Sequence, residues 1–111
     1  MWLLKIAFED KKRILESCEK ALAANPNNPR ALYHLAIVSN KTNESEKAVE
    51  YAKTALLHEK EVILMSAINF ELGSAYQSTK QYDEACEALQ KVTEEPFLTR
   101  AEKKIEIVGC N

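Results

Sequence analysis

The feature that most constrains the fold is a pattern of small and apolar residues that recurs at a nearly constant interval. Leu35-Ala36 is followed 37 residues later by Leu72-Gly73, and Ala21-Leu22 is followed 34 residues later by Ala55-Leu56. Self-similarity with a period of about 20 to 50 residues is typical of proteins built from one repeated supersecondary unit. The chain therefore predicts similar units in series, whereas a plain helical bundle would not explain the recurring interval.

Each unit has the spacing of two helices. Over residues 29–41, and again from about residue 44, core-type residues recur three or four positions apart, as they do along one helix face. Asn28 before Pro29 is a helix start signal, because the Asn side chain can accept a hydrogen bond from a free N–H and proline needs no partner at the first position. The chain has only 2 Gly and 3 Pro, too few for the many turns of a β-sandwich. An all-α fold follows.

The later units are joined differently from the first two. Three extra residues lie around 58–61, so the next helix is expected to begin a turn early, near Glu61 or Val62, and to run through Tyr76. Further helices are expected over about 81–92 and 96–108, with fraying at the last two residues.

The three cysteines, Cys18, Cys86 and Cys110, form no CxxC pair and are too few for a disulfide framework. They predict free thiols in a reducing, cytoplasmic compartment, with Cys18 and Cys86 packed in the core.

The apolar residues 1–8 are interrupted by Lys5 and lack a cleavage site, so they do not resemble a signal peptide. We expect them to pack against the helix around Ile14, Leu15 and Cys18. The alternative is a membrane-binding or self-association role for this segment, although no membrane contact is expected for the chain as a whole.

No residue set indicates catalysis, a metal or a cofactor. His34 and His58 lie on different helices without a second ligand at metal-binding spacing, and Gly73 and Gly109 cannot form a phosphate loop. Lys and Arg total 15 against 17 Asp and Glu, giving a formal net charge of −2, which argues against nucleic-acid binding through bulk charge. We therefore expect no enzyme and no nucleic-acid partner.

Several motifs resemble the tetratricopeptide repeat. Leu72-Gly73-x-x-Tyr76 is similar to its Leu-Gly-x-x-Tyr element, and Tyr82-Asp83-Glu84-Ala85 and the stretch 21–28 (ALAANPNN) are similar to its second helix and its ending. Asn69 and Leu32 depart from the motif, which favours Trp there. The resemblance implies a right-handed stack of antiparallel helical hairpins: a partial repeat over 1–28, repeats over 29–61 and 62–95, and a capping helix over 96–109.

The resemblance also implies a function, as a protein-interaction module or scaffold that binds a peptide or partner protein. The binding surface would be the concave face formed by the first helix of each hairpin. The residues expected on it are Arg30, Tyr33, Ile37, Asn40, Lys41, Phe70, Ser74 and Gln77. The rings of Tyr33 and Phe70 occupy matching places, and either they stand side by side in the groove or they close the gap between helices. A clamp for a C-terminal carboxylate is not expected, because Glu71 has the wrong charge.

Two other functions stay open at this stage. An RNA-binding helical repeat would use Tyr33 and Phe70 for base stacking beside Arg30 and Lys41. Self-association is also possible, because repeat arrays usually need about three units and this chain is near that minimum. A weak homodimer, or a place in a larger chain or assembly, would complete the stack.

Overall fold

The described part of the chain is entirely helical. The computed structural model describes residues 2–110, with side chains from residue 9 onward. Its six helices are α1 (Trp2–Ala24), α2 (Pro29–Lys41), α3 (Ser45–His58), α4 (Val62–Ser78), α5 (Tyr82–Gln90) and α6 (Phe97–Val108). The predicted all-α fold is confirmed, and so are the start of α2 after Asn28 and the early start of α4. Asn28 caps α2 by accepting a hydrogen bond from the backbone N–H of Ala31 at 3.1 Å.

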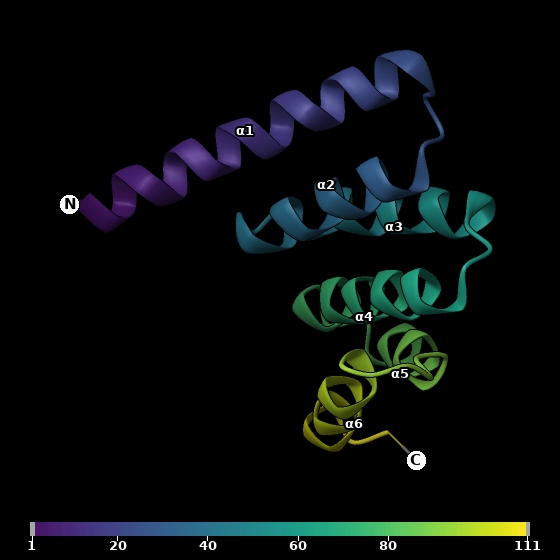
Figure 1. Cartoon of the computed structure of the whole chain (residues 1–111). Coiled ribbons are helices and arrows are strands. Elements are labelled where there is room, and N and C mark those ends of the chain that lie inside the picture. The colour runs from purple at the N-terminus through teal and green to yellow at the C-terminus, as the bar shows by residue number, and fades with distance from the viewer. Residues whose placement is uncertain (1, 111) are drawn as a thin grey trace.

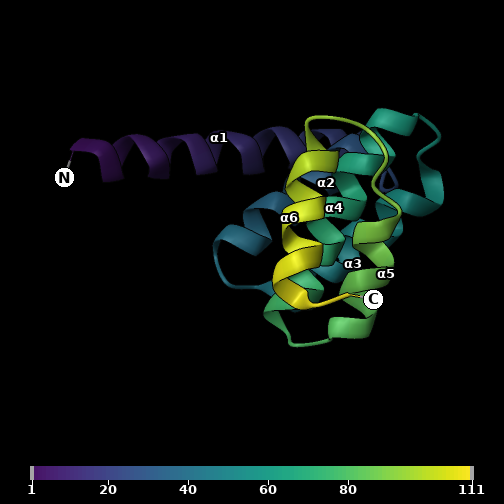
Figure 2. The ribbon, with the colours of Figure 1, turned by 90° about the horizontal axis from the view of Figure 1, so that it is seen from below.

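The helices form two layers. Helices α2 and α3 pair as one hairpin and α4 and α5 as the next, while α2, α4 and α6 follow one another in direct contact (Figure 1). Helices α3 and α5 form the other side of the stack, where each packs against α4 (Figure 2). This is the arrangement that the resemblance implied, with the first helices of successive hairpins in one layer.

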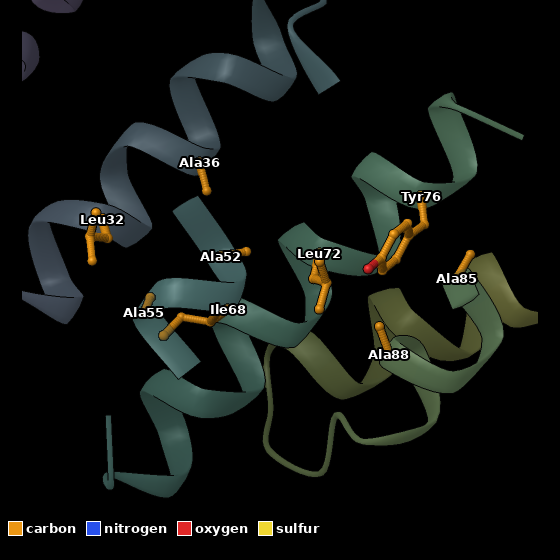
Figure 3. Packing of buried hydrophobic residues seen from close by; sticks show 9 residues of the cluster. All are labelled: Leu32, Ala36, Ala52, Ala55, Ile68, Leu72, Tyr76, Ala85 and Ala88. Atoms are coloured by element: carbon orange, nitrogen blue, oxygen red, sulfur yellow. The ribbon is translucent and has the colours of Figure 1, made fainter. Parts of the chain in front are cut away.

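Small residues allow the hairpins to pack closely. The main core consists of residues from α2 to α5, and more than half of them are alanines (Figure 3). These core residues are Leu32, Ala36, Ala52, Ala55, Ile68, Leu72, Tyr76, Ala85 and Ala88. A second cluster of Leu89, Val92 and Ala101 holds α6 against α4 and α5. Alanines let two helix backbones approach closely enough for the larger side chains to fill the remaining space.

The N-terminal segment does not fold back as expected. Residues 2–24 form one continuous helix, α1, whose contacts within the described structure are with α2 alone. Its N-terminal part extends beyond the other helices (Figures 1 and 2). The expectation that residues 1–8 pack near Ile14 and Cys18 is wrong for the described residues 2–8, because no Gly or Pro interrupts the helix and a straight helix cannot return on itself. Met1 lies outside the described residues.

The cysteine prediction is also corrected. Cys86 in α5 and Cys110 after α6 form a disulfide, with Cα atoms 5.6 Å apart, while Cys18 is free and buried as expected. Gly109 has φ 85°, a left-handed conformation that glycine adopts without strain. It ends α6 by donating to the carbonyl of Ile105 at 3.0 Å and turns Cys110 back toward α5 instead of letting it fray.

Candidate protein-binding face

The residues expected on the binding surface come from α2 and α4, and we call the surface formed by α2, α4 and α6 the first-helix face. The structure divides the expected residues among three neighbourhoods: the junction of α2 and α4, the junction of α4 and α6, and a cleft between α1 and α2. Arg30 lies outside these sets and is exposed at the start of α2.

At the junction of α2 and α4, a single asparagine connects the two hairpins. The Nδ2 group of Asn40 donates to both the backbone oxygen and Oε1 of Glu71, each at 3.0 Å. The Oδ1 atom of Asn40 is buried and has no hydrogen-bond partner among the described residues. A buried acceptor left without a donor costs free energy.

Tyr33 lies beside the same junction. Its ring is half-buried against the core, and its ring neighbour is His34 with centroids 5.5 Å apart. Burial, and then the carboxylate of Glu71, raise the pKa of Tyr33 above its ordinary value, whereas Arg100 of α6 lowers it. The phenol is thus under the influence of charges from both α4 and α6.

At the junction of α4 and α6, Phe70 is an interhelical spacer. Its ring lies 6.5 Å from that of Phe97, and the Lys104 ammonium lies 5.6 Å from its centroid. Lys104 also donates to Oε1 of Gln77 at 3.2 Å. Phe70 is therefore paired with residues of α6 and not with Tyr33, and it closes the gap between helices, one of the two alternatives left open by the sequence. The hydroxyl of Ser74 donates to the backbone oxygen of Phe70 at 2.9 Å.

Ile37 and Lys41 face a third neighbourhood. They line a cleft of about 460 Å³ together with residues of α1, including Ile14, which is 39% exposed. The residues that line it come from α1, from α2 and from Thr42 just after α2, and Figure 1 shows that α1 diverges from α2 toward its N-terminus. Ile37 and Lys41 therefore belong to the α1–α2 cleft, which adjoins the first-helix face.

Sequence reasoning missed the contribution of α6. Arg100 and Lys104 bring positive charge to the first-helix face, and none of the ion pairs between described residues involves them or Arg30 and Lys41. The signal was present, because α6 follows a complete hairpin and so occupies the place of another first helix. A capping helix is not expected to carry binding residues, so the sequence prediction included none of the outward side chains of α6.

The described residues contain neither a cluster that could form a metal site nor a membrane-spanning helix. Among the described residues, no group of three or more His, Cys, Asp or Glu side chains could hold a metal ion. None of the helices in the described range is both long enough and apolar enough to cross a membrane.

Two stretches of the chain match family models described as tetratricopeptide repeat, over residues 17–50 and 66–95. Together they cover more than half of the 111 residues. No curated protein and no solved structure matches the chain significantly. Tetratricopeptide repeats generally mediate protein–protein interaction or scaffolding and are typically not catalytic. With its recurring motifs, its stacked hairpins and these two matches, the chain belongs to the tetratricopeptide repeat family.

Proposed function

We propose that this chain is a non-catalytic interaction module that binds an extended segment of a partner protein on the first-helix face. The observation that carries the proposal is the combination of groups around Tyr33. The half-buried phenol of Tyr33 lies on α2, and the cation of Arg100, which takes part in none of the ion pairs between described residues, lies on α6. Aromatic and arginine side chains are the most frequent energetic anchors of interfaces.

Each of these groups suits one feature of a peptide. The ring of Tyr33 offers a bound segment apolar area with a polar tip. Arg30 and Arg100, together with Lys104, favour a segment that carries acidic side chains over a basic one. Asn40 donates to only one carboxylate oxygen of Glu71, Oε1, at 3.0 Å, so Glu71 keeps its negative charge near these cations.

RNA binding is less well supported. Stacking of a base needs an open aromatic face. The Lys104 ammonium lies over the ring of Phe70, and the ring of Phe97 lies 6.5 Å from it, so the ring of Phe70 does not offer an open stacking face. This leaves Tyr33 without a second stacking partner on the same face.

The test is selection of a random-peptide display library on the immobilised, disulfide-intact chain. Affinities of the enriched peptides are then measured by fluorescence anisotropy for Tyr33→Ala and Arg100→Glu. Because anchor residues commonly account for 2 kcal/mol or more, we expect each change to weaken binding by about tenfold or more. Lys60→Glu, an exposed lysine in the loop between α3 and α4, is the matched charge control and should leave affinity within about twofold of wild type.

The proposal fails if peptides are enriched but bind all these variants equally, or if no peptide is enriched at all. Circular dichroism of each variant shows whether a lost affinity reflects a lost fold.

We further propose that the open α1 end takes part in assembly. Among the described helices α1 has contacts only with α2, and the side chain of Ile14 is partly exposed beside the α1–α2 cleft. A weak homodimer or a place in a larger chain or assembly would cover it. Sedimentation equilibrium tests the dimer: a single monomeric species at high concentration would remove it.

The cytoplasmic location stays a prediction, but the state of the cysteines on which it was based is different in the structure. It depended on three free thiols, whereas Cys86 and Cys110 are joined. Stable disulfides are rare in reducing compartments, so this bond favours an oxidising one.

A further inference from the structure

One repeat position is uncovered in α1, although the same position is buried in both complete hairpins. Ile14 stands 34 residues before Ala48 of α3, which stands 37 residues before Ala85 of α5. Both alanines are fully buried, whereas Ile14 is 39% exposed. In the α4–α5 hairpin the first helix covers this position, because a Cβ atom added at Gly73 of α4 would lie 3.5 Å from the backbone oxygen of Ala85. Helix α1 is thus a second helix in repeat register, and among the described residues no first helix pairs with it.

The uncovered position opens into two hollows. One is the α1–α2 cleft of about 460 Å³, where Ile14 lies with Ile37 and Val38 of α2. The other, of about 210 Å³, also includes Ile14 and is bordered by His34 of α2. We call the two hollows together the α1 groove. Its lining runs along α1 over residues 10–18, which is about 12 Å at 1.5 Å per residue, so about two turns of another helix would cover it.

The apolar stripe beside the groove continues into the N-terminal half of α1. At 3.6 residues per turn, positions 4, 7 and 8 precede positions 11, 14, 15 and 18 along one side of the helix. The sequence places Leu4, Ala7 and Phe8 at the first three of these positions. This half of α1 extends beyond the other helices (Figures 1 and 2). Because α1 is continuous, it cannot turn back into the groove of its own chain, but it can reach the groove of a second copy.

The charges in the middle of α1 favour one orientation for two copies. Residues 9–13 read Glu-Asp-Lys-Lys-Arg, so the acids precede the bases. In a parallel pair each residue would face its own equivalent, and like charges would meet. In an antiparallel pair centred between Asp10 and Lys11, each acid of one copy faces a base of the other. The ion pair of Asp10 with Arg13 within α1, at 3.8 Å, leaves both side chains more than half exposed and accessible to a second copy.

The same register brings the apolar stripe to the groove. It places Ala7 of one copy opposite Ile14 of the other, and Leu4 opposite residue 17, next to the buried Cys18. The antiparallel direction is also the one that the two helices of a repeat hairpin have. The charge pattern and the apolar pattern therefore select one arrangement, in which the second copy supplies the first helix that α1 lacks.

We propose that this chain forms a twofold-symmetric dimer in which residues 2–13 of each α1 cover the α1 groove of the other copy in antiparallel orientation. The same contact is made twice, so the assembly closes at two copies. This inference rests on the proposed role of the α1 end in assembly and names a second copy as its partner. It does not depend on peptide binding by the first-helix face, because neither Tyr33 nor Arg100 lines the groove.

Sedimentation equilibrium of the disulfide-intact chain compares the wild type with Ile14→Glu and Ile63→Glu. Ile63 in α4 is 52% exposed and lies outside the groove, so its substitution is the matched control. We expect Ile63→Glu to dimerise like the wild type and Ile14→Glu to raise the Kd of the dimer at least tenfold, because a charge is then buried at each of the two equivalent contacts. Circular dichroism shows that each variant is folded.

The orientation is measured without changing the apolar contact. Lys12→Cys and Glu19→Cys, both at exposed positions of α1, are labelled separately with a nitroxide. The label attaches to the introduced thiol, because Cys18 is buried and the other two cysteines are joined. Double electron–electron resonance then gives the distance between the two copies. In the proposed register the two labels are offset along the helix axis by about 5 Å at residue 12 and about 26 Å at residue 19, whereas a parallel pair gives equal distances at both sites.

The proposal is overturned if the wild type stays monomeric at high concentration, if folded Ile14→Glu dimerises as tightly as the wild type, or if the two label distances are equal. A dimer that Ile14→Glu does not weaken would leave the assembly proposal standing and show that the contact lies elsewhere. Peptide binding is measured separately with Tyr33→Ala and Arg100→Glu, so its failure is distinguishable from failure of the dimer.

Discussion

Gly73 in α4 faces the side chain of Leu89 in α5, and replacing it with alanine tests how closely these helices pack. A Cβ atom at residue 73 would lie 2.6 Å from both Cγ and Cδ2 of Leu89. Favourable carbon–carbon contacts begin near 3.5 Å, and Leu89 is only 1% exposed, so its side chain has little room to move. The substitution therefore forces either the side chain or the helix to shift.

Two effects of opposite sign set the magnitude. Overpacking a core by one methyl group typically costs about 1 to 3 kcal/mol. Alanine is better than glycine inside a helix by about 1 kcal/mol. We expect Gly73→Ala to lower the free energy of unfolding by about 1 kcal/mol, although an exposed glycine in a helix would gain stability from the same change.

The neighbouring hairpin supplies the matched control. Residues 73 and 89 correspond to Ala36 and Ala52, each 37 residues earlier, and both alanines are fully buried in the core. The α2–α3 hairpin has two alanines at these positions, whereas the α4–α5 hairpin has glycine and leucine. The double variant Gly73→Ala/Leu89→Ala therefore reproduces a pair that the chain already uses.

Urea unfolding followed by circular dichroism measures this double-mutant cycle. Leu89→Ala alone should cost about 2 to 5 kcal/mol. In that background Gly73→Ala should become stabilising by about 1 kcal/mol, because the clash is gone and the helix propensity remains. The reasoning is refuted if Gly73→Ala stabilises the wild type, or if its effect is the same in both backgrounds.

Two further predictions concern stability. The Cys86–Cys110 bond closes a sequence separation of 24 residues, so dithiothreitol or Cys110→Ser should lower the free energy of unfolding by about 3 kcal/mol in urea titrations. An unchanged midpoint in dithiothreitol would contradict this. Partial burial of its ring, and then the charge of Arg30, hold the pKa of His34 below its ordinary value of 6.5. The unfolded chain then binds more protons than the folded one, so stability should fall as the pH drops through 6.5 toward the lowered value, and His34→Gln should reduce this slope. An equal slope in the variant would show that other groups are responsible.

The helix positions were largely predictable because their signals are local. Asn28-Pro29 marks the start of α2, and the core-facing spacing continues through α2, α3 and α4 without reference to the rest of the molecule. The recurring interval then required similar hairpins in series, and the family matches agree. The fate of residues 2–8 was mispredicted because apolar composition indicates burial but does not say against which surface.

The candidate site was predictable only in part. Helical spacing identified the outward residues of α2 and α4, but whether such a residue is free depends on what the next helix brings to it. The ring of Phe70 is in contact with Phe97 and Lys104, and the side chain of Asn40 donates a hydrogen bond to Glu71. These contacts depend on the rotation of each hairpin relative to the next. The spacing of residues along one helix does not determine that rotation.

The amino-acid sequence by itself determined the kind of unit and the order of units, because capping residues and a period of 3.6 act within one helix. The tertiary structure alone decided which side chains meet between units. It brought Cys86 to Cys110 and left the buried amide oxygen of Asn69 without a hydrogen-bond partner among the described residues. The physical reason is that such meetings depend on interhelical distance and angle, which result from packing the whole set of side chains together.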